Sequence, residues 1–258
     1  MENHHLVAGR ECEEQELYQE ALIEYGKAVE AEPANPVPLL HRAALLAEVG
    51  QYAPALEDYT RALEIDPYES AAYNNRGDVY ASLGRHEDAI ADFTQALFLN
   101  SNDVDSYYNR GLSLAELGRM TQALEDLTAA IALDARHGGA YNNRGLVHVA
   151  LGDYAGAVAD FSKALEVRSG FACSFDHRGL AYEKLGDLRS AIQDYTDALA
   201  IAPHNADSLY HRACAYREAG ETEKARSDFQ LLLKVTDTKH PFVALARQKI
   251  KELESHSP

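Results

Sequence analysis

An internal repeat of 34 residues runs through almost the whole chain. One alanine recurs at that interval through seven units, and a second alanine follows it seven residues later in six of them. The first set is Ala21, Ala55, Ala89, Ala123, Ala157, Ala191 and Ala225. No insertion breaks the register. The chain therefore repeats one structural unit, and each copy is expected to pack against its neighbours to complete a core.

Counting position 1 from Glu2 places the repeats at 2–35, 36–69, 70–103, 104–137, 138–171, 172–205 and 206–239, with a tail at 240–258. Position 15 is glycine in six repeats, whereas the first repeat has Glu16 there. Glycine readily adopts the left-handed backbone that ends a helix. This predicts two helices per unit, joined by a tight turn at position 15.

The tail has the pattern of one further amphipathic helix. Pro241 begins a segment whose apolar residues share one helical face, and charged residues occupy the other. The apolar residues are Phe242, Leu245, Ala246, Ile250 and Leu253. We expect residues 240–258 to form a capping helix and tail that cover the last hairpin.

The third repeat carries a recognisable pattern in Tyr73, Gly77, Tyr80, Gly84, Ala89, Phe93 and Ala96. With these residues the chain resembles the tetratricopeptide repeat (TPR) family over residues 2–239. The resemblance implies an all-α, right-handed α-solenoid superhelix of seven helix-turn-helix repeats plus a C-terminal capping helix. It also implies binding of a protein or peptide rather than catalysis.

The charge balance narrows the choice of partner. Lys and Arg number 24 against 41 Asp and Glu, giving a formal net charge of -17. Such a chain repels polyanions, so we expect no nucleic acid and no membrane partner, and a protein or peptide that is neutral to basic. No apolar run approaches the roughly 20 residues that span a bilayer. Three widely separated cysteines fit a reducing compartment, so the expected location is cytoplasmic.

Arginine at position 7 and aspartate at position 23 occur together in six repeats. Both positions lie eight residues from the turn at position 15, so they should be level on two antiparallel helices. We expect structural ion pairs within the hairpins rather than an anion-binding ladder. The central pairs are Arg76 with Asp92, Arg110 with Asp126, and Arg144 with Asp160.

A second stripe of the first helix is made by positions 2, 5, 6, 9, 12 and 13, which we call the inner face. In TPR proteins this face lines the concave groove that receives extended peptides. Position 6 reads His41, Asn75, Asn109, Asn143, His177 and His211. An asparagine amide can bond both backbone groups of a peptide residue, so the row predicts a peptide-binding ladder. It resembles the asparagine ladder of O-linked N-acetylglucosamine transferases, although no transferase domain is present. The alternative is that asparagine is simply common on solvated helices.

Other inner-face residues are candidates for the same groove: Asn74, Asp78, Tyr108, Leu112, Asn142 and Leu146. Tyr108 and Tyr210 could anchor a partner, and Asp78 and Asp176 could meet its basic side chains. Ordinary helix surface is the alternative for each. A carboxylate clamp for acidic chaperone C-terminal tails needs lysines at positions 2 and 5, and neither position has one in any repeat from the second to the seventh. Chaperone tails are therefore not expected partners.

No phosphate-binding loop, zinc-spaced cysteine set or His-Glu-x-x-His motif occurs in the sequence. We therefore expect no enzyme activity, no cofactor and no metal. The sequence predicts an adaptor or scaffold that binds an extended peptide. Three alternatives stay open: a self-assembling structural protein with no peptide ligand, a redox or nucleophilic role for Cys173 and Cys214, and RNA binding, which the charge disfavours.

Overall fold

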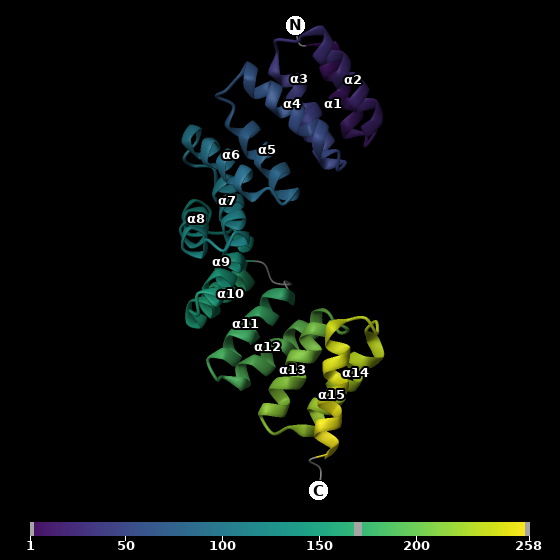
Figure 1. Ribbon diagram of the computed structural model, residues 1–258, viewed down its shortest axis with the longest axis vertical. Helices are drawn as coiled ribbons and strands as arrows, with labels where there is room; N and C mark the ends of the chain where they lie inside the picture. The colour runs from purple at the N-terminus through teal and green to yellow at the C-terminus, as the bar shows by residue number, and fades with distance from the viewer. Residues whose placement is uncertain (1–2, 168–171, 256–258) are drawn as a thin grey trace. The chain divides into compact units, whose positions relative to one another are not determined.

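The computed structural model describes residues 3–167 and 172–255, and all regular structure in these ranges is α-helical (Figure 1). Glu2, the end of the fifth repeat at 168–171 and the end of the tail at 256–258 lie outside the described residues. The helices are α1 (His4–Glu14), α2 (Tyr18–Ala31), α3 (Pro36–Glu48), α4 (Tyr52–Ile65), α5 (Ser70–Ser82), α6 (His86–Leu99), α7 (Val104–Glu116), α8 (Met120–Leu133), α9 (Gly138–Ala150), α10 (Tyr154–Val167), α11 (Ala172–Lys184), α12 (Leu188–Ile201), α13 (Ala206–Glu218), α14 (Thr222–Val235) and α15 (Pro241–Ser255).

Each repeat supplies two helices that meet at the predicted turn. The glycines at position 15 all have positive φ angles, for example +71° at Gly84. In the first repeat the same turn is made by Glu16, with φ 59°. Nothing lies within 4 Å of a Cβ built at Gly84, so backbone conformation rather than space favours glycine there. The predicted turn position is confirmed.

The chain divides into two compact units. Unit 1 spans Met1–Leu133 and unit 2 spans Asp134–Pro258. In unit 1 the second helix of each hairpin packs on the first helix of the next, namely α2 on α3, α4 on α5 and α6 on α7. Unit 2 repeats the arrangement with α10 on α11 and α12 on α13. Each unit is therefore a stack of hairpins whose core lies between successive helices.

Close approach within a hairpin is allowed by a small residue at position 8, which is glycine in five repeats and Ala43 or Ala213 in the other two. A Cβ built at Gly77 in α5 would lie 2.7 Å from Cε1 of Phe93 in α6, closer than real contacts allow. Gly145 faces Phe161 in the same way. Both phenylalanine rings are fully buried. The ring at position 24 thus packs directly on the backbone of the partner helix, which fixes the spacing of the hairpin.

The last hairpin is covered by α15, as the tail pattern predicts. Val243 and Ala246 of α15 are buried in one cluster with Phe229 and Leu232 of α14. Helix α15 contacts both α13 and α14. The apolar face of the final repeat is therefore shielded from water by a single additional helix.

Candidate functional site

The position 7 arginines are engaged inside their hairpins. Arg76 donates from Nε to Oδ2 of Asp92 at 2.7 Å and from Nη2 to Oδ1 at 2.8 Å. The side chain of Asp92 is only 9% exposed. The hydrogen bond with Asp92 raises the pKa of Arg76, outweighing burial. The same geometry recurs in Arg42–Asp58, Arg110–Asp126, Arg144–Asp160, Arg178–Asp194 and Arg212–Asp228. These arginines hold helices together.

These arginines have a second partner, which positions 7 and 23 alone do not predict. Arg76 Nη1 donates to Thr60 Oγ1 at 3.2 Å, which links α5 to the preceding hairpin. Arg110 donates to Thr94 at 3.1 Å in the same way. The signal was visible, because position 25 is threonine or serine in five consecutive repeats: Thr60, Thr94, Thr128, Ser162 and Thr196.

In unit 1 the inner face combines exposed and engaged amides. Asn75 is exposed, whereas Asn109 donates from Nδ2 to Oδ1 of Asp78 at 2.7 Å. Asn74 accepts a hydrogen bond of 3.0 Å from Ser106, which joins α5 to α7. The remaining candidates, Tyr108 and Leu112, are half-buried. Asn75 is thus the candidate amide that faces solvent here, and Asn74 and Asn109 take part in contacts between hairpins.

In unit 2 the two candidate asparagines make contacts within the protein, one inside α9 and one between helices. Asn143 donates from Nδ2 to the carbonyl of Gly139, one turn earlier in α9, at 3.0 Å. Asn142 accepts from Ser174 of α11 at 2.9 Å. Leu146 is 37% exposed on the same helix. The sequence pattern locates these residues on the first helix but does not reveal these intramolecular partners.

The position 6 histidines lie against the aromatic ring at position 24 of the preceding repeat. Ring centroids are 5.6 Å apart for His41 and Tyr25, 5.6 Å for His177 and Phe161, and 5.7 Å for His211 and Tyr195. Each imidazole is therefore within ring-contact distance of the aromatic residue before it. Burial lowers the pKa of His177. Each of these histidines therefore packs against an aromatic residue of the hydrophobic core.

Two residues expected on the open face are covered instead. Asp176 is buried and its Oδ2 lies 3.3 Å from Nδ1 of His211. Burial lowers the pKa of His211, but the hydrogen bond and charge of Asp176 outweigh it, and the net shift is upward. The ring of Tyr210 is stacked on Phe242 of α15, with centroids 4.2 Å apart and planes at 3°. The capping helix thus removes Tyr210 as an anchor, a contact that repeat spacing alone does not predict.

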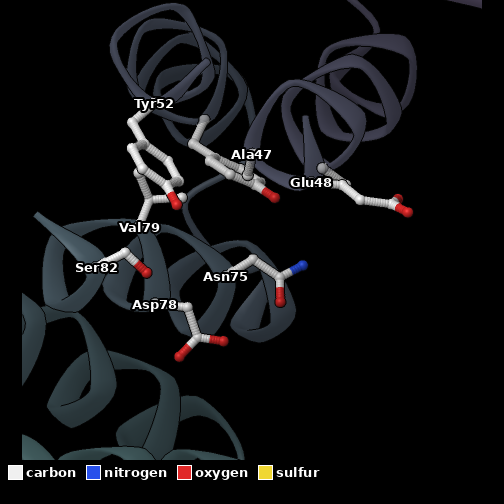
Figure 2. A pocket seen from close by; sticks show the side chains of 9 residues that line it. Ala47, Glu48, Tyr52, Asn75, Asp78, Val79 and Ser82 are labelled. Atoms are coloured by element: carbon white, nitrogen blue, oxygen red, sulfur yellow. The ribbon is translucent and has the colours of Figure 1, made fainter. Parts of the chain in front are cut away.

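One recess in unit 1 is formed by inner-face residues of two neighbouring first helices (Figure 2). It has a volume of about 340 Å³. Its walls are Ala44, Ala47 and Glu48 of α3, Tyr52 and Tyr59 of α4, and Asn75, Asp78, Val79 and Ser82 of α5. We call it the α3–α5 pocket. Sequence reasoning found its inner-face members but missed Tyr52 and Tyr59, because they come from a second helix.

The polar wall of the α3–α5 pocket is electrostatically unusual. The Asp78 side chain is exposed on its solvent side, yet its position in the recess, which removes part of its hydration, followed by the charges of Asp105 and Asp103, raises its pKa to about 6. Burial raises the pKa of Tyr59 to about 12, and Asn75 is hydrogen-bonded to its hydroxyl. The pocket therefore combines an apolar floor with one carboxylate that is costly to ionise.

The cysteines do not form a reactive site of the usual kind. Cys173 is exposed, and burial raises the pKa of the half-buried Cys214 thiol, which disfavours the reactive thiolate. Over residues 3–167 and 172–255, no three His, Cys, Asp or Glu side chains converge as metal ligands would. No helix among those described has both the length and the apolar character required to cross a bilayer.

Models of known protein families match most of the repeats. Tetratricopeptide repeat models match residues 58–91, 108–171 and 178–241, and a TPR repeat model matches residues 77–118. No curated protein sequence matches the chain.

Solved structures give the same result. YrrB, a TPR protein with an unusual peptide-binding site, is 27% identical over 72% of this chain and 95% of its own, with a TM-score of 0.63. PilF of Pseudomonas aeruginosa is 20% identical over 88% of this chain and 99% of its own, with a TM-score of 0.70. A TPR protein of Parabacteroides merdae is 19% identical over 97% of each chain, with a TM-score of 0.69. The last two likenesses establish the fold alone. On its repeats, its hairpin geometry and these matches, the chain belongs to the tetratricopeptide repeat family.

Proposed function

We propose that this protein is a non-enzymatic interaction scaffold that binds an extended segment of a partner protein on the inner face of its first helices. The observation that carries the proposal is the α3–α5 pocket. It is lined by positions 9, 12 and 13 of the second repeat and positions 6, 9 and 13 of the third. These are positions of the face that receives peptides in other TPR proteins.

The surface around the pocket supports a peptide ligand. Asn75 is exposed, and beyond its hydrogen bonds to Asn74 and Tyr59 its amide has one further donor and one further acceptor for the backbone of an extended chain. Ala44, Ala47 and Val79 give an apolar floor on which a side chain could be desolvated. The excess of 41 acidic over 24 basic residues favours a neutral or basic partner. The similarity to YrrB, a TPR protein with a peptide-binding site, supports the proposal that this chain also binds a peptide.

The test is to select binders from a displayed library of random 12-residue peptides. The affinities of the selected peptides are then measured with synthetic copies. The full chain is compared with the double variant Asn75→Ala, Asn109→Ala. The matched control is Glu64→Ala with Thr121→Ala, which alters exposed residues on second helices of unit 1. Circular dichroism checks that each variant keeps its helicity.

We expect peptides selected by the wild type to bind the control unchanged and to lose about tenfold or more in affinity for the inner-face variant. If the peptides bind both variants equally well, the peptide-binding site lies on another surface. Failure of the wild type to select any peptide, together with a mass in sedimentation that rises with concentration, would favour self-assembly instead.

A further inference from the structure

The α3–α5 pocket contains the carboxylate of Asp78, whose side-chain hydrogen bond comes from a neutral amide. Among the residues that the structure describes, the ion pairs involve no contact between a lysine or arginine and Asp78. Its hydrogen-bond donor is the neutral amide of Asn109. The charges that act on it, those of Asp105 and Asp103, are negative. A carboxylate in this setting gains more from a cation than one in open water.

This acid is specific to the third repeat. Position 9 is Ala44, Asp78, Leu112, Leu146, Leu180 and Cys214 in repeats two to seven. Asp78 therefore does not belong to the recurring pattern that holds the hairpins together. A residue that departs from the repeat, destabilises its own charge and lines a recess is a candidate for recognition.

The rest of the wall suits a long side chain with a charged end. Ala44, Ala47 and Val79 would cover a methylene stem, and Val79 belongs to a buried core cluster. Asn75 and Ser82 add polar oxygens beside Asp78. Figure 2 shows the Glu48 carboxylate pointing away from the recess, and Tyr18 of α2 hydrogen-bonds it. Asp78 is therefore the carboxylate that a cation in the pocket would meet.

We propose that the α3–α5 pocket receives an arginine side chain of the partner peptide, with the guanidinium paired to Asp78 and its stem on the alanine and valine floor. Arginine fits better than lysine because its planar group has five donors to share among Asp78, Asn75 and Ser82, and because it is less strongly hydrated. This inference rests on the proposed function, since it names the side chain that the peptide-binding face selects.

Asp78→Asn is the decisive variant. Its amide oxygen can still accept the hydrogen bond from Asn109 Nδ2, so the contact between α5 and α7 is kept while the charge is removed. Glu64→Gln is the matched control, because it removes one negative charge from an exposed residue that does not line the pocket.

The probes are peptides selected by the wild-type chain from the displayed library, synthesised with arginine, lysine or citrulline at one position. Citrulline has the shape of arginine without its charge. We expect wild-type winners to share an arginine in one register, and citrulline to weaken binding about tenfold. Asp78→Asn should lose the same factor for the arginine peptide and nothing for the citrulline peptide. Glu64→Gln should bind as the wild type does.

Several results would overturn the inference. Winners without a shared arginine, or a citrulline penalty that persists in Asp78→Asn, would show that Asp78 does not pair with the peptide. Lysine binding as tightly as arginine would overturn the choice of guanidinium. In these cases the proposed function stands, provided the peptides still lose affinity for Asn75→Ala, Asn109→Ala. If the wild-type chain selects no peptide, the proposed function is wrong, and this inference is wrong with it.

Discussion

Asn109 of α7 donates a hydrogen bond of 2.7 Å from Nδ2 to Oδ1 of Asp78 in α5. The contact joins the inner faces of two successive hairpins in unit 1. It also supplies one hydrogen bond to a carboxylate whose pKa is raised to about 6 by removal from water and by neighbouring acids. One neutral donor does not offset these costs. The residue that we assign to recognition is therefore also a source of instability in the free protein.

Asp78→Asn should stabilise the protein at neutral pH. The folded pKa of about 6 lies above the ordinary value of 3.8, so the folded state holds the proton where the unfolded chain has released it. The contribution of Asp78 to the free energy of unfolding of the wild type therefore falls as the pH rises from about 4 to 6. The gain in melting temperature should be full above pH 7, shrink below pH 6 and vanish near pH 4. Thermal melts across this range test it.

The groups around Asp78 define the controls for that experiment. The charges of Asp105 and Asp103 act on Asp78 from the start of α7. Glu48 of α3, whose carboxylate points away, and Tyr52 and Tyr59 of α4 line the same pocket. Glu64→Gln, away from this cluster, should show no such gain. An Asp78→Asn advantage that is constant from pH 4 to 8 would contradict the electrostatic cause.

Arg76→Ala should destabilise unit 1 more than Asp92→Ala does. Without Arg76, a buried carboxylate loses its two charged hydrogen bonds, at a cost of about 3 kcal/mol. Without Asp92, the arginine keeps its bond to Thr60 and can reach water. Urea denaturation followed by circular dichroism measures both. Arg85→Ala is the control, because its pair with Asp88 is half exposed and should move the midpoint little. Equal losses in Arg76→Ala and Arg85→Ala would contradict this.

Glu16→Gly should stabilise the first hairpin by about 1 kcal/mol. Glu16 is the one non-glycine residue with positive φ among those described, at 59°, and glycine adopts that conformation without a steric penalty. Six other repeats already use glycine at this turn. Glu16→Ala keeps the steric penalty and serves as the control. Native-state hydrogen exchange in α1 and α2 should slow in Glu16→Gly alone, and unchanged exchange would count against a strained turn.

Phe242→Ala should loosen the last hairpin of unit 2. The centroids of the Phe242 and Tyr210 rings are 4.2 Å apart. Removal of the Phe242 ring exposes apolar surface, so it should lower the free energy of unfolding by about 2 kcal/mol. Leu245→Ala on the same helix is the matched control, since Leu245 is 41% exposed. Hydrogen exchange in α14 should quicken for Phe242→Ala and stay unchanged for Leu245→Ala. Equal effects would show that helix content of α15, rather than the stacked ring, protects the hairpin.

The repeat unit, the position of each turn and the helix that covers the last hairpin can all be predicted from the amino-acid sequence. These follow from local rules: glycine favours the left-handed turn, and apolar spacing sets the packed face. The sequence also indicated which helix face carries Asn75 and Asp78. A regular repeat makes such inferences possible, because each unit meets nearly the same neighbours.

Contacts between helices determine which inner-face residues are already engaged within the protein, and the sequence does not show these contacts. Asn109 is engaged by Asp78, Asp176 by His211 and Tyr210 by Phe242. The tertiary structure also placed Tyr52 and Tyr59 of a second helix beside Asp78 to make a pocket. These contacts join residues from different helices, and their occurrence depends on side-chain size, burial and charge at each crossing. A 34-residue period specifies a position on a helix, but not what the neighbouring helix brings to it.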